Sequence, residues 1–226
     1  VVYSEVLNPH FRSGRGVTVD ATGKVWVAYS TRNPAGIQGI DPQTFKKTKV
    51  YTTTNIPIYK PDSQGVMKPT GKTGSTGRLY GIVGDSKGRL YANEWAGQPV
   101  MVRFDTNKRK FDMLMTGFQC GTYGIALDGK NRVFAGCSDG RGPAVGMYDP
   151  ASNKWTDFYP PGKLGNRLPK PKETGPAPTS CPSGCPGFLK SYMRTTAVAV
   201  EPATGDVWAT FYRIGYVGRL AINENN

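Results

Sequence analysis

Histidine is almost absent from this chain and cysteine is scarce, with one His and four Cys among 226 residues. Covalent haem attachment requires a Cys-x2-Cys-His motif, which does not occur. Structural zinc sites usually combine Cys-x2-Cys spacings with further Cys or His, whereas this chain offers Cys181 and Cys185 in a Cys-x3-Cys arrangement and a distant His10. We therefore predict no cofactor and no bound metal, with zinc as the rival of a disulfide at the cysteines.

Long apolar runs are also missing. No stretch approaches the roughly 18 apolar residues of a membrane-spanning helix, and the longest candidates, such as 195–200, have the length of a strand. No signal peptide is recognisable, and the sequence begins at Val1, as a processed mature chain or an incomplete sequence would. The sequence therefore predicts a chain without a transmembrane helix.

Acidic residues are few compared with basic ones. Lys and Arg number 29 against 16 Asp and Glu, which gives a formal net charge of +13. Such a charge predicts attraction to an acidic partner, with nucleic acid, an anionic membrane surface and an acidic protein as the candidates. Nucleic acid is the least favoured, because no nucleic-acid motif occurs and the Gly-rich stretch 71–77 lacks the pattern and the helix of a phosphate loop. A diffusely basic protein without such a partner is the alternative.

The four cysteines form two local pairs. Cys120 and Cys137 flank one predicted hairpin, and Cys181 and Cys185 lie in a segment rich in Pro and Gly. An even number of cysteines in local pairs predicts two disulfides, which persist in an oxidising compartment. We therefore predict an extracytoplasmic protein, either periplasmic or secreted.

Four segments of the chain repeat one another, and this repeat decides the predicted fold. Each copy has two alternating apolar runs around a turn that contains Gly or Asn, which is typical of a β-hairpin. The first copy reads Gly-Val-Thr-Val-Asp, a turn, then Lys-Val-Trp-Val-Ala, and the copies begin at residues 16, 81, 124 and 197. A third apolar run follows in every copy and a fourth in the first three. The sequence therefore predicts an all-β chain, a β-propeller of four-stranded antiparallel blades.

The predicted blades occupy about 16–52, 80–116, 123–159 and 196–222, and the last one lacks a fourth strand of its own. Residues 1–7 form a spare apolar run, and its pairing with the last blade would close the ring. A fragment of a longer propeller would also begin with an unpaired outer strand. An incomplete ring is therefore the alternative to a closed ring of four blades.

Two insertions, 53–79 and 160–195, separate the blades and are rich in Gly, Pro, Ser, Thr and Lys. This composition predicts long loops rather than a fifth blade, and the length of the loops indicates a functional role. In an up-and-down meander both insertions would share one face, the working face, with the loops between second and third strands. Basic side chains gather in both insertions and predict a docking surface there. They are Lys60, Lys68, Lys72, Arg78, Lys163, Arg167, Lys170, Lys172, Lys190 and Arg194.

The repeated unit resembles the blades of a known enzyme family. It reads Gly-Ile-Ala-x-Asp, a short turn, Arg/Lys-Val-Trp/Tyr-x-Ala and then Ile-Asp-Pro, and it is similar to the blades of streptogramin lyases (virginiamycin B lyase-like proteins) and, more broadly, to NHL-type repeats. The resemblance covers most of the chain outside the insertions and implies a β-propeller. In that family the residue before Gly-Ile is often His, and the implied chemistry is an acid–base elimination that uses His, a carboxylate and Mg²⁺. Because the equivalent residues here are Arg15, Tyr80, Tyr123 and Thr196, we do not expect lyase activity.

Several residues are candidates for binding a ligand at the mouth of the central channel: Arg15, Tyr80, Glu94, Trp95 and Tyr123. Glu94 has neither a second carboxylate nor a His in its own loop, which favours ion pairing over acid–base catalysis. Trp95 falls in a predicted loop and is a binding candidate for that reason. The second strands carry matching aromatic residues that we expect to pack between neighbouring blades, namely Trp26, Tyr91, Phe134 and Trp208.

Together these features predict a non-catalytic extracytoplasmic propeller that docks through basic insertions onto an acidic protein. An accessory subunit of a membrane-bound electron-transfer complex is one specific form of this prediction. The alternative is a lyase-like or hydrolase-like propeller enzyme, or a protein that binds a small polar ligand at the channel mouth. We predict no catalytic residue.

Overall fold

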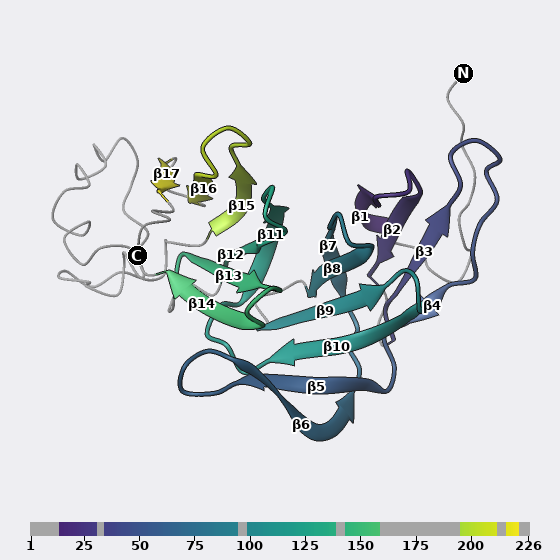
Figure 1. Cartoon of the computed structure of the whole chain (residues 1–226), viewed down its shortest axis with the longest axis horizontal. Helices are drawn as coiled ribbons and strands as arrows, with labels where there is room; N and C mark the ends of the chain where they lie inside the picture. Colours follow the sequence, from purple (N-terminus) through teal and green to yellow (C-terminus); the bar gives the residue numbers. More distant parts are fainter. Residues whose placement is uncertain are drawn as a thin grey trace, which may run out of the picture.

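The computed structural model describes residues 14–30, 34–94, 99–138, 143–158, 195–211 and 216–221, and every helix-or-strand element in these ranges is a β-strand. Four sheets follow one another along the chain, and we call them blades 1 to 4 (Figure 1). Blade 1 contains β1 (Gly14–Val19), β2 (Val25–Tyr29), β3 (Gly36–Ile40) and β4 (Tyr51–Thr52). Blade 2 contains β7 (Leu79–Gly84), β8 (Arg89–Glu94), β9 (Val100–Asp105) and β10 (Lys110–Thr116). Blade 3 contains β11 (Thr122–Leu127), β12 (Val133–Cys137), β13 (Val145–Asp149) and β14 (Lys154–Phe158), and blade 4 contains β15 (Thr195–Val200), β16 (Val207–Phe211) and β17 (Tyr216–Leu220).

Consecutive strands within every blade are antiparallel. This arrangement confirms the predicted all-β propeller of four blades. Blade 4 has three strands within the described part of the chain. The strand predicted over residues 1–7, whose pairing with blade 4 would close the ring, lies outside the described residues.

A buried aspartate organises the first hairpin of blades 1 to 3. The Asp85 carboxylate, for example, accepts hydrogen bonds from the backbone N–H groups of Lys87 at 2.9 Å and Arg89 at 2.8 Å. The turn then needs a residue with positive φ, which is Gly88 here and Asn131 in blade 3. Asp side chains that hydrogen-bond to the following backbone are typical of tight turns, so the sequence signal has a direct physical basis.

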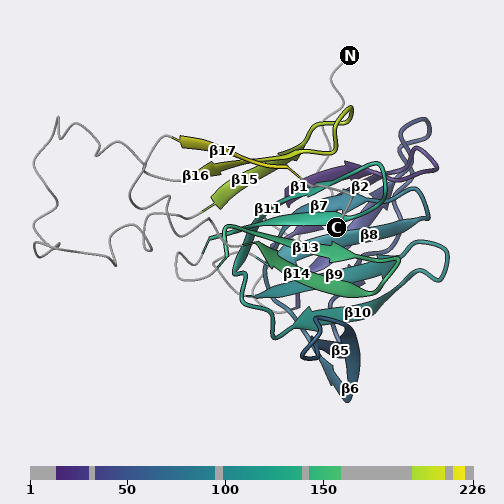
Figure 2. The same cartoon turned by 60° about the vertical axis from the view of Figure 1, so that its left-hand side comes forward.

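The inner strands β1, β7, β11 and β15 lie side by side in one arc (Figures 1 and 2). Glycine permits the close approach between them. A Cβ added to Gly16 of β1 would lie 2.5 Å from the carbonyl oxygen of Tyr80 in β7, and one added to Gly124 would lie 2.7 Å from Cα of Ala197 in β15. Among the described strands, no packing comparable to these contacts joins β15 back to β1.

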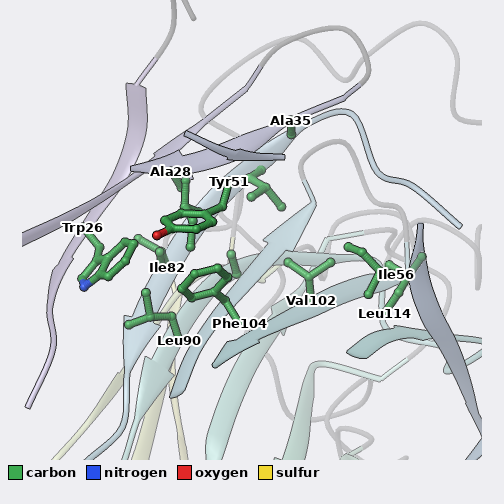
Figure 3. Packing of buried hydrophobic residues seen from close by; sticks show 13 residues of the cluster. Trp26, Ala28, Ala35, Tyr51, Ile56, Ile82, Leu90, Val102, Phe104 and Leu114 are labelled. Carbon is green, nitrogen blue, oxygen red and sulfur yellow. The ribbon is translucent and has the colours of Figure 1, made fainter. Parts of the chain in front are cut away.

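Apolar side chains fill the spaces between blades. The Trp26 ring of blade 1 lies 5.4 Å from the Phe104 ring of blade 2, centroid to centroid, and Leu90 and Ile82 complete this layer (Figure 3). Tyr91 and Tyr148 make the corresponding contact between blades 2 and 3, at 5.9 Å. The predicted packing of the second-strand aromatics between blades is therefore confirmed for the first three copies, where Trp26, Tyr91 and Phe134 are at most 3% exposed.

The same prediction is wrong for the fourth copy. Trp208 is 40% exposed, although it occupies the position of Trp26 in the repeat. The physical reason is that no further blade packs against this side of blade 4 in the described part of the chain.

The first insertion forms strands at the edge of blade 2, although the sequence predicts a loop there. β5 (Ile56–Pro61) and β6 (Met67–Gly74) make an antiparallel hairpin, and β5 pairs in parallel with β10, the outer strand of blade 2. Ile56 and Met67 are each 1% exposed because they pack against residues far away in the sequence. Low apolar content hides this arrangement at the level of sequence, since few side chains of an outer hairpin need to be buried.

A disulfide joins Cys120 to Cys137, with Cα atoms 4.8 Å apart, as predicted. The second predicted pair, Cys181 and Cys185, lies outside the described residues. No helix long and apolar enough to cross a membrane occurs in the described ranges.

Candidate functional site

Three of the predicted channel-mouth residues occupy equivalent positions on neighbouring inner strands. Arg15 lies on β1, Tyr80 on β7 and Tyr123 on β11. The Tyr80 and Tyr123 rings have their centroids 4.7 Å apart, and a hydrogen bond of 3.2 Å joins their two hydroxyl groups. We call these two residues the tyrosine pair.

The electrostatics of the tyrosine pair favour the neutral phenol. The hydrogen bond with Tyr123 and partial burial raise the pKa of Tyr80, and they outweigh the opposite effect of the Arg15 charge. A phenol with a raised pKa is protonated at neutral pH and can donate or accept a hydrogen bond. It is poorly suited to serve as a general base.

Asn93, which sequence reasoning missed, holds the strands of the tyrosine pair in place. It is 0% exposed, its side-chain amide donates to the carbonyl oxygen of Tyr123 at 2.5 Å, and its side-chain oxygen accepts from the Gly81 N–H at 2.9 Å. Asn93 therefore bridges β7 and β11 next to the tyrosine pair. A signal was present in the repeat, where Ala28 and Gly136 occupy the equivalent positions and only blade 2 has an amide.

Glu94 has a structural partner. Its carboxylate accepts a hydrogen bond from the Thr76 hydroxyl, and its backbone carbonyl lies 3.4 Å from the Thr122 hydroxyl. Trp95 lies outside the described residues. Across the described ranges, no group of three or more His, Cys, Asp or Glu side chains is placed to hold a metal ion.

The basic residues of the first insertion lie on the β5–β6 hairpin and just beyond it. Lys60 on β5 is directly opposite Lys68 on β6, and Lys72 lies further along β6. All three are exposed, and Arg78 is exposed at the start of blade 2. The other predicted docking residues lie outside the described residues; they are Lys163, Arg167, Lys170, Lys172, Lys190 and Arg194.

The hairpin lysines differ from the arginines of the blades. In blade 2, Arg89 pairs with Asp85 at 2.5 Å and Arg103 pairs with Asp112 at 2.8 Å. In blade 3, Arg132 pairs with Asp128 at 2.6 Å, which repeats the pair of Arg89 and Asp85. These arginines neutralise carboxylates that stabilise the blades. Within the described ranges, Lys60, Lys68 and Lys72 form no ion pair, so their charges face solvent.

The hairpin itself is anchored to blade 3 as well as to blade 2. The Gly65 carbonyl accepts from the Trp155 N–H at 2.8 Å, and the Asn153 side chain donates to the Met67 carbonyl at 2.8 Å. The hairpin lysines are therefore presented on a strand pair that is fixed at both its base and its tip. Asn153 was not identified from the sequence, because its partner lies in a segment that the sequence predicts to be a loop.

No protein-family model and no curated protein matches this chain. Solved structures do resemble it. A streptogramin B lyase structure superposes with a TM-score of 0.57 at 13% identity, covering 97% of this chain and 58% of the lyase. A structure of U3-55K superposes with a TM-score of 0.62 at 13% identity, covering 98% of this chain and 53% of that protein.

The chain has a β-propeller fold. The computationally designed Ika4 protein is also similar, with a TM-score of 0.57 at 12% identity, and the match covers 98% of this chain and 100% of Ika4. Identities this low show the fold and nothing finer. The chain spans just over half the length of the lyase and U3-55K structures that it resembles.

Proposed function

We propose that this chain is a non-catalytic β-propeller that docks onto an acidic protein surface through the basic side chains of its insertions. The observation that carries the proposal is the β5–β6 hairpin, whose exposed lysines have no carboxylate partner in the described part of the chain. Lys60 and Lys68 are directly opposite each other, an arrangement of like charges that is unfavourable in an isolated sheet. An acidic partner would relieve this repulsion.

The rigidity of the hairpin supports binding. Pairing of β5 with β10 and the hydrogen bonds to Asn153 and Trp155 fix the backbone beneath the lysines. A fixed backbone lowers the entropy that binding costs, and a net charge of +13 steers an acidic partner toward the chain.

We place the partner outside the cytoplasm, because the Cys120–Cys137 disulfide is typical of proteins in oxidising compartments. A membrane-bound electron-transfer complex, with this chain as an accessory subunit, is the form of the proposal to test first. The partner would need a cluster of carboxylates on its surface that can pair with the lysines of the hairpin.

The test compares two triple variants with the wild-type chain as bait on the extracytoplasmic and membrane fractions of the source. The first carries Lys60→Glu, Lys68→Glu and Lys72→Glu. The control carries the same charge change at other exposed lysines, Lys46→Glu, Lys87→Glu and Lys110→Glu. We expect an acidic protein to bind the wild type and the control at low salt and to dissociate as NaCl is raised. It should bind the hairpin variant about tenfold more weakly, within the range of about 3- to 150-fold that corresponds to the loss of three exposed ion pairs of about 0.2–1 kcal/mol each.

Equal weakening by the two triple variants would contradict docking at the hairpin, because it would show that only net charge matters. Vesicles that contain phosphatidylserine distinguish lipid from protein: salt-sensitive binding to these vesicles without a protein partner would assign the lysines to a membrane surface. In that case the protein-docking proposal would be rejected.

The tyrosine pair supports a second candidate, a small polar ligand at the channel mouth. Two phenols and the Arg15 guanidinium can stack against a ring and hydrogen-bond to polar groups. A Tyr80→Phe/Tyr123→Phe variant would keep the aromatic faces and remove both hydroxyls. Ligand-induced thermal stabilisation that disappears in this variant would establish the second candidate.

A further inference from the structure

Exposed apolar side chains are concentrated at the two ends of the arc of blades. Four of the five large apolar side chains that are exposed in the described residues lie there: Val17 and Val19 on blade 1, and Trp208 and Val217 on blade 4. Their exposed fractions are 66%, 55%, 40% and 61%, respectively. We call the side of a blade that faces the preceding blade its leading face, and the opposite side its trailing face.

Trp208 and Val217 lie on the trailing face of blade 4. Strand register places both on the same side of the sheet, because Trp208 pairs with Arg219 and Val217 pairs with Thr210. The exposed Ala197 and Ala199 belong to this face as well, since Ala199 pairs with Trp208. The trailing face of blade 4 thus carries four exposed apolar side chains, together with Thr210 and with Arg219, whose guanidinium lies over the Trp208 ring.

The same repeat positions are buried in every other blade. The equivalents of Trp208 are Trp26, Tyr91 and Phe134, which are 3%, 0% and 0% exposed. The equivalents of Val217 are Ile37, Met101 and Val145, which are 0%, 0% and 3% exposed. Each of these trailing faces packs against the leading face of the next blade, whereas no blade follows blade 4 among the described residues.

The leading face of blade 1 is likewise exposed at positions that are buried in blade 2. Val17 is the equivalent of Ile82, which is 5% exposed and reaches the position beside Gly16 of the preceding blade. Val25 is only half-buried, whereas its equivalent Leu90 is 1% exposed. Val19 and Val25 pair across β1 and β2, and Val25 pairs with Ile40, so these residues form one apolar surface.

The two open faces are therefore the two halves of an interface that the chain builds three times internally. Blade 4 has Ala197 where the other blades have Gly16, Gly81 and Gly124. Blade 1 has Val17, and blade 4 has Val198, where blades 2 and 3 have isoleucine. A head-to-tail contact would therefore place the Ala197 methyl group beside a valine and not beside the longer isoleucine.

The geometry points to a second copy of this chain as the occupant of these faces. We propose that the trailing face of blade 4 of each copy packs head to tail on the leading face of blade 1 of the other, which closes a two-fold ring of eight blades. Eight blades lie within the usual range for propellers. Within one copy the two faces lie at opposite ends of the arc, with β15 to β17 at one end and β1 to β3 at the other (Figure 1). A second copy supplies both missing neighbours at once.

The proposal goes beyond docking through the hairpin lysines, and its test does not involve them. The mass of the full chain in solution is measured by size-exclusion chromatography with light scattering, for the wild type and for Val17→Asp and Val217→Asp. Each substitution places a charge on one exposed face and leaves the buried core unchanged. The control is Phe45→Asp at the fifth exposed apolar side chain, a turn position whose positive φ aspartate tolerates.

We expect twice the chain mass for the wild type and for Phe45→Asp, and a single-chain mass for Val17→Asp and for Val217→Asp. Circular dichroism should show native strand content in all four proteins. An equimolar mixture of Val17→Asp and Val217→Asp retains one intact interface, between the trailing face of the first variant and the leading face of the second. This mixture should therefore recover the two-chain mass in part, which neither variant does alone.

Three results would overturn the proposal. A single-chain mass for the wild type would show that a second copy does not cover the two faces, so that any blades that cover them would have to come from another source. A two-chain mass that survives both aspartate substitutions would place the contact elsewhere. A series of masses above two chains would show head-to-tail contact without closure of a ring.

Discussion

A glycine at the third position of the inner strands of blades 1 to 3 sets the distance between neighbouring blades. Gly16, Gly81 and Gly124 leave space that the next inner strand fills with backbone atoms or an isoleucine side chain. A β-carbon at these positions would overlap with those atoms. This requirement concerns close approach rather than backbone conformation, since none of the three glycines has a positive φ.

Gly124→Ala tests this requirement. Its β-carbon would lie 2.7 Å from Cα of Ala197 and 2.8 Å from the Thr196 carbonyl oxygen, so β11 and β15 would have to separate. We expect the free energy of unfolding to fall by about 1–3 kcal/mol, as for other overpacked interiors. Urea denaturation would measure the loss. Gly129→Ala is the matched control, because a β-carbon there meets no atom within 4 Å, and an equal effect of both substitutions would contradict the argument.

Buried tyrosines link the stability of the fold to alkaline pH. Tyr29 is 1% exposed, its hydroxyl donates to the Gln38 side chain at 3.1 Å, and burial raises the pKa of Tyr29 to about 12 from 10.0. Burial also raises the pKa of Tyr91 and of Tyr148. In each case the folded state favours the neutral phenol over the phenolate.

The direction of the resulting pH dependence follows from linkage. In the unfolded chain Tyr29 loses its proton near its ordinary pKa of 10.0, whereas in the folded chain it keeps the proton until about 12. Its stabilising effect is therefore complete below pH 10 and is lost as the pH rises through this window. We expect denaturant unfolding at a series of pH values to show a smaller loss of stability over this range for Tyr29→Phe than for the wild type. Identical slopes for the two proteins would show that Tyr29 is not responsible.

At the scale of elements, the β5–β6 hairpin joins two blades. β5 extends the sheet of blade 2 through parallel pairing with β10. On the side of blade 3, Gly65 at the tip of the hairpin bonds to Trp155 of β14, and Met67 bonds to Asn153 in the turn before β14. Asn153 is central to this contact, because its side chain donates to the Met67 carbonyl and accepts from the Tyr148 hydroxyl at 2.7 Å. The residue also has a φ of 54°, which asparagine tolerates better than most residues.

Substitutions of Asn153 separate its two roles. Asn153→Gly keeps the positive φ and removes both hydrogen bonds, so we expect a loss of about 1–2 kcal/mol in the free energy of unfolding. Asn153→Ala removes the hydrogen bonds and also strains the backbone, so the loss should be larger by about 1 kcal/mol. Urea denaturation gives both values, and limited proteolysis should show faster cleavage within 56–74 in both variants. A hairpin that stays as protease-resistant as in the wild type would contradict its anchoring by Asn153.

At the scale of the whole molecule, four blades form an arc with apolar ends and a basic hairpin on its rim. Within the described ranges, blades 2 and 3 are covered on both sides, whereas blades 1 and 4 each have one side with exposed apolar residues. Closure by a second copy would bury these sides, and it would leave the hairpin lysines free to meet an acidic protein. The two proposals thus use different parts of the surface.

Thermal unfolding should reveal the two-copy ring through mass action. Association that occurs only in the folded state raises the midpoint temperature as the protein concentration rises. We expect the midpoint of the wild type to increase over a hundredfold range of concentration, measured by scanning calorimetry and circular dichroism. The midpoint of Val17→Asp should not change over the same range. A wild-type midpoint that is independent of concentration would argue against the ring.

The sequence by itself determined the features that depend on neighbours along the chain. Alternation of apolar residues, a turn with Asp and Gly or Asn, and fourfold repetition predicted the all-β fold, the four blades and the Cys120–Cys137 disulfide. These signals are local, since a hairpin brings together residues that are close in the sequence. The same regularity allowed equivalent positions such as Arg15, Tyr80 and Tyr123 to be assigned to neighbouring inner strands.

Only the tertiary structure decided the features that depend on distant neighbours. Trp26 and Trp208 have the same place in the repeat, yet one is buried and the other is exposed, because a blade follows the first and none follows the second in the described chain. Residues 56–74 form strands because β10 and Asn153, which lie much later in the sequence, supply hydrogen bonds and apolar contacts. The burial of a side chain depends on the residues that surround it in space and not on its position in the repeat. For that reason the open faces and the anchored hairpin, on which both proposals depend, appear only in three dimensions.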